Sequence, residues 1–181
     1  SSRRNCFSGW VGAYASSLRS GLGMLDKAEL AAANINPETG LATDYLNHFN
    51  EVAMLVDMLG SMPDVAEDIL EWRPITYPEH FLVTGFRAKE LAIEAYNACD
   101  EDIKTRFHSA CEAVEAGVGD IQDKLKEGVE ALPEPSEAAA YLYSLISNVS
   151  GVINPNGFGD VDLSAMSAGS EDQSAIDALF D

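Results

Sequence analysis

Residues 100–132 read DEDIKTRFHSACEAVEAGVGDIQDKLKEGVEAL, and this stretch decides the fold. Its apolar residues recur at spacings of three and four, which is the period of one face of an α-helix. Asp100 is a favourable N-cap residue. The spacing therefore predicts the longest helix of the chain, from Asp100 to about Leu132, with a nearly heptad stripe. The stripe consists of Ile103, Phe107, Ala110, Cys111, Val114, Val118, Ile121, Leu125 and Val129.

Two glycines interrupt the predicted long helix. Gly117 and Gly119 indicate either a close approach by a neighbouring helix or a bend. The length of the stripe also favours a homodimer, because one small bundle would leave part of such a seam uncovered.

Similar periodicity extends outward from this stretch, and no segment shows the strict alternation of a strand. Helices are predicted at about 43–60, 61–72, 87–98 and 137–153, and a weaker one at 10–34, where Gly21 and Gly23 interrupt it. We therefore expect an all-α helical bundle of five to seven helices, with an irregular, proline-containing corner at residues 73–84. The expected organisation is an unstructured lead (1–9), a bundle domain (10–153), a linker (154–169) and a short acidic helix (170–181).

The charge of the chain excludes several classes of partner. Its 181 residues include 11 Lys plus Arg and 30 Asp plus Glu, for a formal net charge of -19. Such a balance argues against binding to nucleic acid or to an anionic membrane surface, and no apolar run reaches the roughly 18 residues of a bilayer span. Three cysteines without metal or redox spacing suit a reducing cytoplasm. We expect a cytoplasmic protein whose partner presents a basic or apolar groove.

The proline-containing corner holds an unusual aromatic sequence. Tyr77, His80 and Phe81 are followed by Phe86 just after Gly85. One interpretation is a groove or small-molecule pocket at the end of the bundle. The other is an aromatic plug that covers the helix ends, with His80 as a hydrogen-bonding cap.

The known catalytic and metal-binding motifs are missing from the sequence. It has no His-Glu-x-x-His, no Glu-x-x-His, no Gly-x-Ser-x-Gly and no phosphate-binding loop. A non-catalytic protein without a cofactor is favoured over an enzyme, although residues 120–123 (Asp-Ile-Gln-Asp) are of types that can position a water molecule. The alternative is a metal-binding bundle, with His48, Glu51, His108 and Glu112 as its ligands if their helices were adjacent.

The last twelve residues predict a separate short helix. Residues 127–181 carry ten acids and no Lys or Arg. Ser170 and Gln173 match the capping box, which satisfies free donors at a helix start. Ile176, Leu179 and Phe180 then form one apolar edge. A helix this short is marginal alone in water, so it should dock either on its own bundle or on a partner.

Residues 173–180 resemble a known docking motif. Their sequence, QSAIDALF, resembles the motif Gln-x-x-Ile-Asp-x-Leu-Leu of flagellar motor switch proteins, which bind the phosphorylated chemotaxis response regulator. It is also similar to the acidic C-terminal peptide of the chemotaxis phosphatase. The resemblance implies that the partner is a receiver domain. Phe180 departs from the usual Leu, and the bundle lacks the phosphatase motif Asp-x-x-x-Gln, so phosphatase activity is not implied. The implied contact residues are Gln173, Ile176, Asp177, Leu179 and Phe180.

These observations predict a non-catalytic bacterial interaction or regulatory protein in signal transduction or chemotaxis. Besides the metal-binding bundle, an acidic antagonist that masks a basic protein surface is an alternative. Residues 41–96 also resemble an uncharacterised bacterial helical family, which implies no activity.

Overall fold

The computed structural model describes residues 21–157. The predictions for residues 1–20 and 158–181, including the lead, most of the linker and the acidic helix, lie outside this range. Within it the regular secondary structure is helical apart from one isolated antiparallel bridge, Ile35–Ala42, which confirms the all-α bundle. Seven α-helices and four short 3-10 helices are described there. The 3-10 helices are Gly21–Met24, Thr43–Tyr45, Pro63–Val65 and Val129–Ala131.

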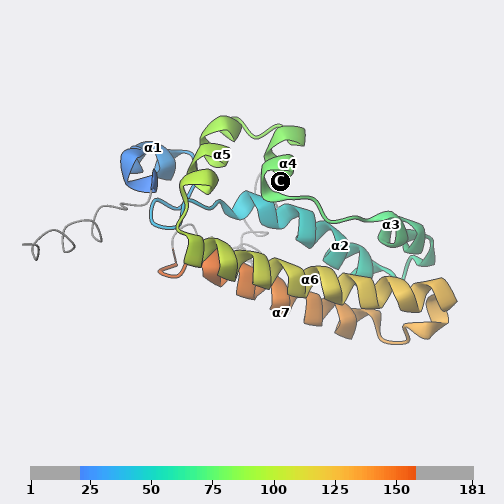
Figure 1. Ribbon diagram of the computed structural model, residues 1–181. Helices are drawn as coiled ribbons and strands as arrows, with labels where there is room; N and C mark the ends of the chain where they lie inside the picture. Colours follow the sequence, from blue (N-terminus) through green and yellow to red (C-terminus); the bar gives the residue numbers. More distant parts are fainter. Residues whose placement is uncertain (1–20, 158–181) are drawn as a thin grey trace, which may run out of the picture.

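Three long helices form the bundle. They are α2 (Leu46–Met58), α6 (Glu101–Glu127) and α7 (Pro135–Ile153). α6 and α7 run side by side along the molecule, and α2 lies along them (Figure 1). Most of the predicted stripe on α6 is buried within the single chain, so it does not by itself require a second copy. The homodimer stays a prediction.

The long helix begins where expected but ends early. The Asp100 side chain accepts a hydrogen bond from the Asp102 backbone N–H, as an N-cap does. α6 ends at Glu127, so the prediction that it reaches Leu132 is wrong. Gly128 adopts a φ of 129°, a conformation that side-chain-bearing residues rarely adopt and that a helix cannot continue.

The two glycines of α6 have different surroundings. A Cβ added at Gly117 would lie 3.1 Å from Leu142 Cδ2 and 3.2 Å from Leu145 Cδ1, both on α7. A Cβ at Gly119 would meet nothing within 4 Å. The close approach of a neighbouring helix is therefore confirmed at Gly117 alone.

Residues 21–34, the described part of the predicted helix 10–34, form two separate short helices. The 3-10 helix Gly21–Met24 is followed by α1 (Lys27–Ala32). Asp26 separates them, because its carboxylate accepts hydrogen bonds from the backbone N–H groups of Ala28 and Glu29. This is an N-cap, which starts a new helix instead of continuing an old one.

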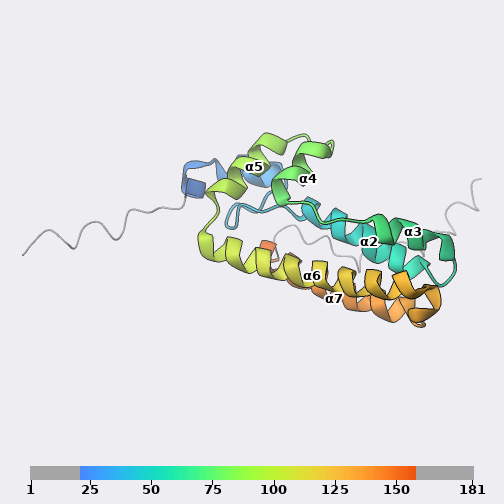
Figure 2. The ribbon, with the colours of Figure 1, turned by 45° about the vertical axis from the view of Figure 1, so that its right-hand side comes forward.

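The proline-containing corner at residues 73–84 contains one short helix, and the helices on either side of it lie outside the corner. α3 (Ala66–Glu71), α4 (Tyr77–Val83) and α5 (Lys89–Ala98) follow one another, and α4 and α5 pair above one end of the bundle (Figure 2). α4 starts with a capping box, in which Thr76 and Glu79 satisfy each other's backbone N–H groups. None of the helices within residues 21–157 is both long and apolar enough to cross a bilayer.

Candidate functional site

The aromatic residues of the corner pack on one another. Tyr77, His80 and Phe81 are buried and Phe86 is half-buried. The Phe81 ring lies 4.7 Å from the Tyr77 ring, 5.0 Å from His80 and 4.9 Å from Phe86, measured between centroids. His80 Nε2 lies 3.1 Å from Asp44 Oδ2, which ties α4 to the 3-10 helix Thr43–Tyr45 just before α2. This geometry is that of an aromatic plug held by a polar pair.

Two buried tyrosines fix the extended chain before α4. The Tyr45 hydroxyl donates to the Ile75 carbonyl at 2.8 Å, and the Tyr77 hydroxyl accepts from the Ala42 backbone N–H at 2.9 Å. Burial raises the pKa of both hydroxyls above their ordinary value, so they stay neutral at physiological pH. The Tyr45 bond holds Ile75 beside α6, and the Tyr77 bond ties the start of α4 to Ala42.

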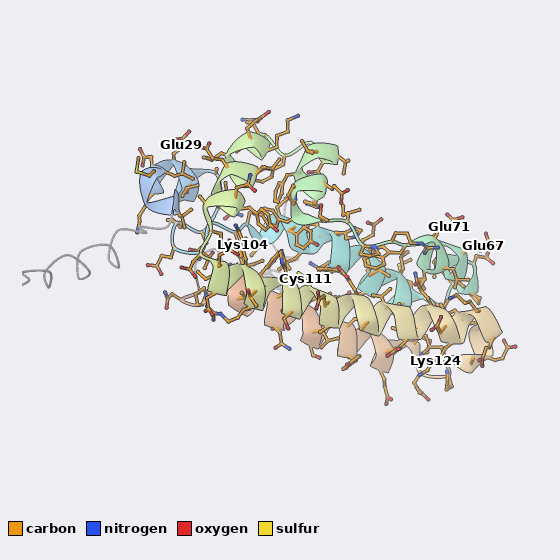
Figure 3. All side chains as sticks on the ribbon, viewed as in Figure 1. Glu29, Glu67, Glu71, Lys104, Cys111 and Lys124 are labelled. Atoms are coloured by element: carbon orange, nitrogen blue, oxygen red, sulfur yellow. The ribbon has the colours of Figure 1, made fainter. Side chains whose placement is uncertain are left out.

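A groove of about 390 Å³ opens between residues 74–79 and α6. We call it the acidic groove. Figure 3 shows Cys111 on the face of α6 that is directed toward α4 and the chain before it. Buried side chains form the floor, and exposed or half-buried ones form the two walls. The floor is Tyr45, Tyr77, Phe107 and Cys111; the walls are Pro74, Ile75, Thr76 and Glu79 on one side and Tyr96, His108, Glu112 and Glu115 on the other.

The groove is acidic, and no Lys or Arg of the described residues lines it. Burial and the neighbouring charge of Glu112 raise the pKa of the Glu115 carboxyl, with His108 opposing. Hydrogen bonds from Thr76 lower the pKa of Glu79. Among the described residues, none of these three glutamates forms an ion pair.

The thiol at the floor of the groove is not activated as a nucleophile. Burial, with Glu115 and Glu112 nearby, raises the pKa of Cys111 to about 12. Burial likewise raises the pKa of Cys99 to about 11. Nucleophilic cysteines need the opposite shift, toward the thiolate. The groove therefore offers recognition chemistry, with apolar surface and carboxylates, and no activated nucleophile.

The four candidate metal ligands do not converge. The His48 ring stacks on Trp72 at 4.8 Å, and its buried Nε2 has no hydrogen-bond partner. His108 Nε2 lies 2.8 Å from the Tyr96 hydroxyl. Glu51 is exposed on α2, whereas Glu112 lies in the acidic groove. Residues 21–157 contain no group of three or more His, Cys, Asp or Glu side chains that could hold a metal ion.

The amide of the acid-amide cluster at 120–123 is already engaged. Gln122 Nε2 donates to the carbonyls of Ile69 at 2.8 Å and Trp72 at 2.9 Å. These carbonyls belong to the C-terminal end of α3, where a helix leaves acceptors unpaired. Gln122 thus has a structural role that joins α3 to α6.

The sequence did not point to the acidic groove. Of its lining residues, Tyr77 was expected in the aromatic corner, and His108 and Glu112 were candidate metal ligands. Tyr96 and Glu115 were missed. One signal existed: His108, Glu112 and Glu115 follow the i, i+4, i+7 spacing of one helix face. The predicted contact residues at 173–180 lie outside the described range. No family model, curated protein or solved structure matches this chain.

Proposed function

We propose that this protein is a non-catalytic signalling protein that docks a receiver domain through residues 173–180. The observation that carries the proposal is the sequence of that segment. It places Ile176, Leu179 and Phe180 on one helical edge, behind a capping box and between acidic residues. A receiver domain with a basic or apolar groove would bind the apolar edge or the acidic residues that flank it.

The end of α7 gives the segment a fixed point of attachment. Thr39 Oγ1 donates to the Ile153 carbonyl at 2.8 Å, and Asn36 Nδ2 donates to Asn154 Oδ1 at 3.0 Å. Asn156 Nδ2 donates to Glu38 Oε2 at 3.0 Å. Residues 158–172 follow this anchor and, fully extended, would span at most about 50 Å. That reach supports contact with a partner outside the bundle.

The proposed binding mode couples helix formation to docking. A twelve-residue helix is marginal alone, so part of the contact energy is used to order it. The capping box and the acids of the first turn reduce this cost by satisfying donors and complementing the helix dipole. The apolar edge then supplies most of the affinity, and the acids supply steering and selectivity.

The test compares two double variants of the full chain. Ile176→Ala with Leu179→Ala removes two residues of the proposed edge. Val161→Ala with Leu163→Ala is the matched control, because it removes two apolar side chains from the same acidic region outside the motif. Each protein is titrated by calorimetry with a chemotaxis-type single-domain response regulator, with and without beryllofluoride, and its melting temperature is recorded.

We expect the motif variant to lose about 2 kcal/mol or more of binding to the activated receiver domain, with an unchanged melting temperature. The control should bind as the native chain does. Absence of binding by the native chain would overturn the proposal. A lower melting temperature of the motif variant without any loss of binding would show instead that the segment packs on its own bundle.

A further inference from the structure

We infer that the acidic groove binds an arginine side chain from a basic, extended segment of a partner protein. None of the described residues that line the groove belongs to 173–180, so the inference does not depend on the proposed receiver docking.

Charge complementarity identifies the occupant. Three carboxylates, those of Glu79, Glu112 and Glu115, line the groove, and no Lys or Arg does. Arg73 and Lys104, which are close in sequence to the groove residues Pro74 and His108, are already engaged. Arg73 donates to the Leu70 and Trp72 carbonyls, both at 2.7 Å, and Lys104 donates to the Asn97 carbonyl and to Glu101. Apart from His108, the described residues therefore place no free cation at these glutamates, and a cation from a partner can pair with them.

The aromatic lining favours an organic cation over a simple ion. Tyr45, Tyr77 and Phe107 form most of the floor, and Tyr96 lies at the edge. Lys104 Nζ sits 5.6 Å from the centroid of the Tyr96 ring, so a cation already uses one member of this aromatic group. A guanidinium fits both parts of the groove, because its planar face stacks on aromatic surface and its edge donates in pairs to carboxylates.

The shape of the groove favours a side chain carried by an extended segment. One wall is the extended chain at 74–76, and the other is the face of α6 that bears His108, Glu112 and Glu115. Seven residues of helix rise about 10 Å, which is the length of roughly three extended residues. The groove is thus long enough for an arginine with one neighbour on each side, and its acids lie on both walls.

The experiment uses the isotope-labelled full chain and three capped tripeptides at physiological ionic strength. The probes are glycine–arginine–glycine, the lysine equivalent, and the citrulline equivalent, which keeps the shape of arginine without its charge. Amide resonances of α6 and of residues 74–79 report occupancy. Two double variants have the same change in net charge: Glu112→Gln with Glu115→Gln in the groove, and Asp120→Asn with Glu127→Gln on the same helix outside it.

We expect saturable shifts of the groove amides with the arginine peptide, at least about tenfold weaker binding of the citrulline peptide, and weaker binding of the lysine peptide. The groove variant should lose about tenfold in affinity, and the control less than about twofold. An equal loss in both variants would overturn the inference, because it would reveal attraction to the overall negative charge. Equal binding of the citrulline peptide, or no saturable shift in the native chain, would also overturn it.

Discussion

The α6–α7 hairpin and the aromatic corner are built in different ways. The hairpin joins two long helices through apolar stripes and the close approach at Gly117, and α7 carries a single charged residue, Glu137. The corner joins short helices through specific polar contacts, such as those of Tyr45 with Ile75 and of His80 with Asp44. The two helices of the hairpin follow from helical periodicity. The corner depends on individual side chains, and the acidic groove lies along its border with α6.

Removing the Phe81 ring, at the centre of the aromatic corner, should have the largest effect on the stability of the chain. Phe81 is fully buried among Tyr77, His80 and Phe86. Phe81→Ala leaves a cavity and should lower the free energy of unfolding by about 3–5 kcal/mol, measured by urea denaturation. A loss below about 1 kcal/mol would show that the corner contributes little to the stability of the bundle.

The close approach in the hairpin can be tested by two changes on one helix. Gly117→Leu places a side chain where Leu142 and Leu145 already lie, and should cost about 1–3 kcal/mol of stability. Gly119→Ala faces open space and should stabilise the chain by about 0.5–1 kcal/mol, because alanine favours a helix over glycine. Thermal melts of both variants check this. Equal effects at the two sites would contradict the packing described for α7.

His48 and Glu115 should give the chain opposite responses to pH. Burial lowers the pKa of His48 below its ordinary value of 6.5. The unfolded chain then binds a proton that the folded chain resists, so this contribution to stability is present above pH 6.5 and is lost as the pH falls below it. His48→Phe keeps a ring against Trp72 and should remove this loss, which is less than about 1 kcal/mol because the ring is partly solvated. Urea melts at pH 7 and pH 5 measure it; an unchanged pH slope in the variant would contradict the assignment.

The smallest expected effect is that of Glu115, whose contribution to stability changes with pH in the direction opposite to that of His48. Burial beside Glu112 raises the pKa of Glu115 above its ordinary value of 4.5. The folded chain then holds the proton more tightly, so this contribution is present below pH 4.5 and is lost as the pH rises through the raised pKa. Glu115→Gln should stabilise the chain by a few tenths of a kcal/mol at pH 7 and by less at pH 4. Glu127→Gln, an exposed matched change on α6, should not reproduce this pH dependence; if it did, the effect would belong to net charge.

The features that the sequence could predict belong mainly to the hairpin, and those that it could not belong mainly to the breaks between helices and to the acidic groove. Periodicity and the Asp100 cap located α6, and the all-α class followed from the same signal in the flanking segments. The break at Asp26 and the stop at Gly128 were not foreseen, because a cap inside an apolar pattern and a positive φ leave no periodic signal. The acidic groove could not be foreseen either. It needs Tyr45 to hold residue 75 beside α6, and that is a contact between segments far apart in the chain.

The central claim is that a folded body carries a separate docking segment, and one titration tests it most directly. The isotope-labelled full chain is titrated with an unlabelled, beryllofluoride-activated chemotaxis-type receiver domain, and amide shifts are followed along the whole chain. The account predicts saturable shifts confined to about residues 170–181, with the amides of α2, α6 and α7 unchanged. Shifts in those three helices while the amides of 170–181 stay unchanged would contradict it.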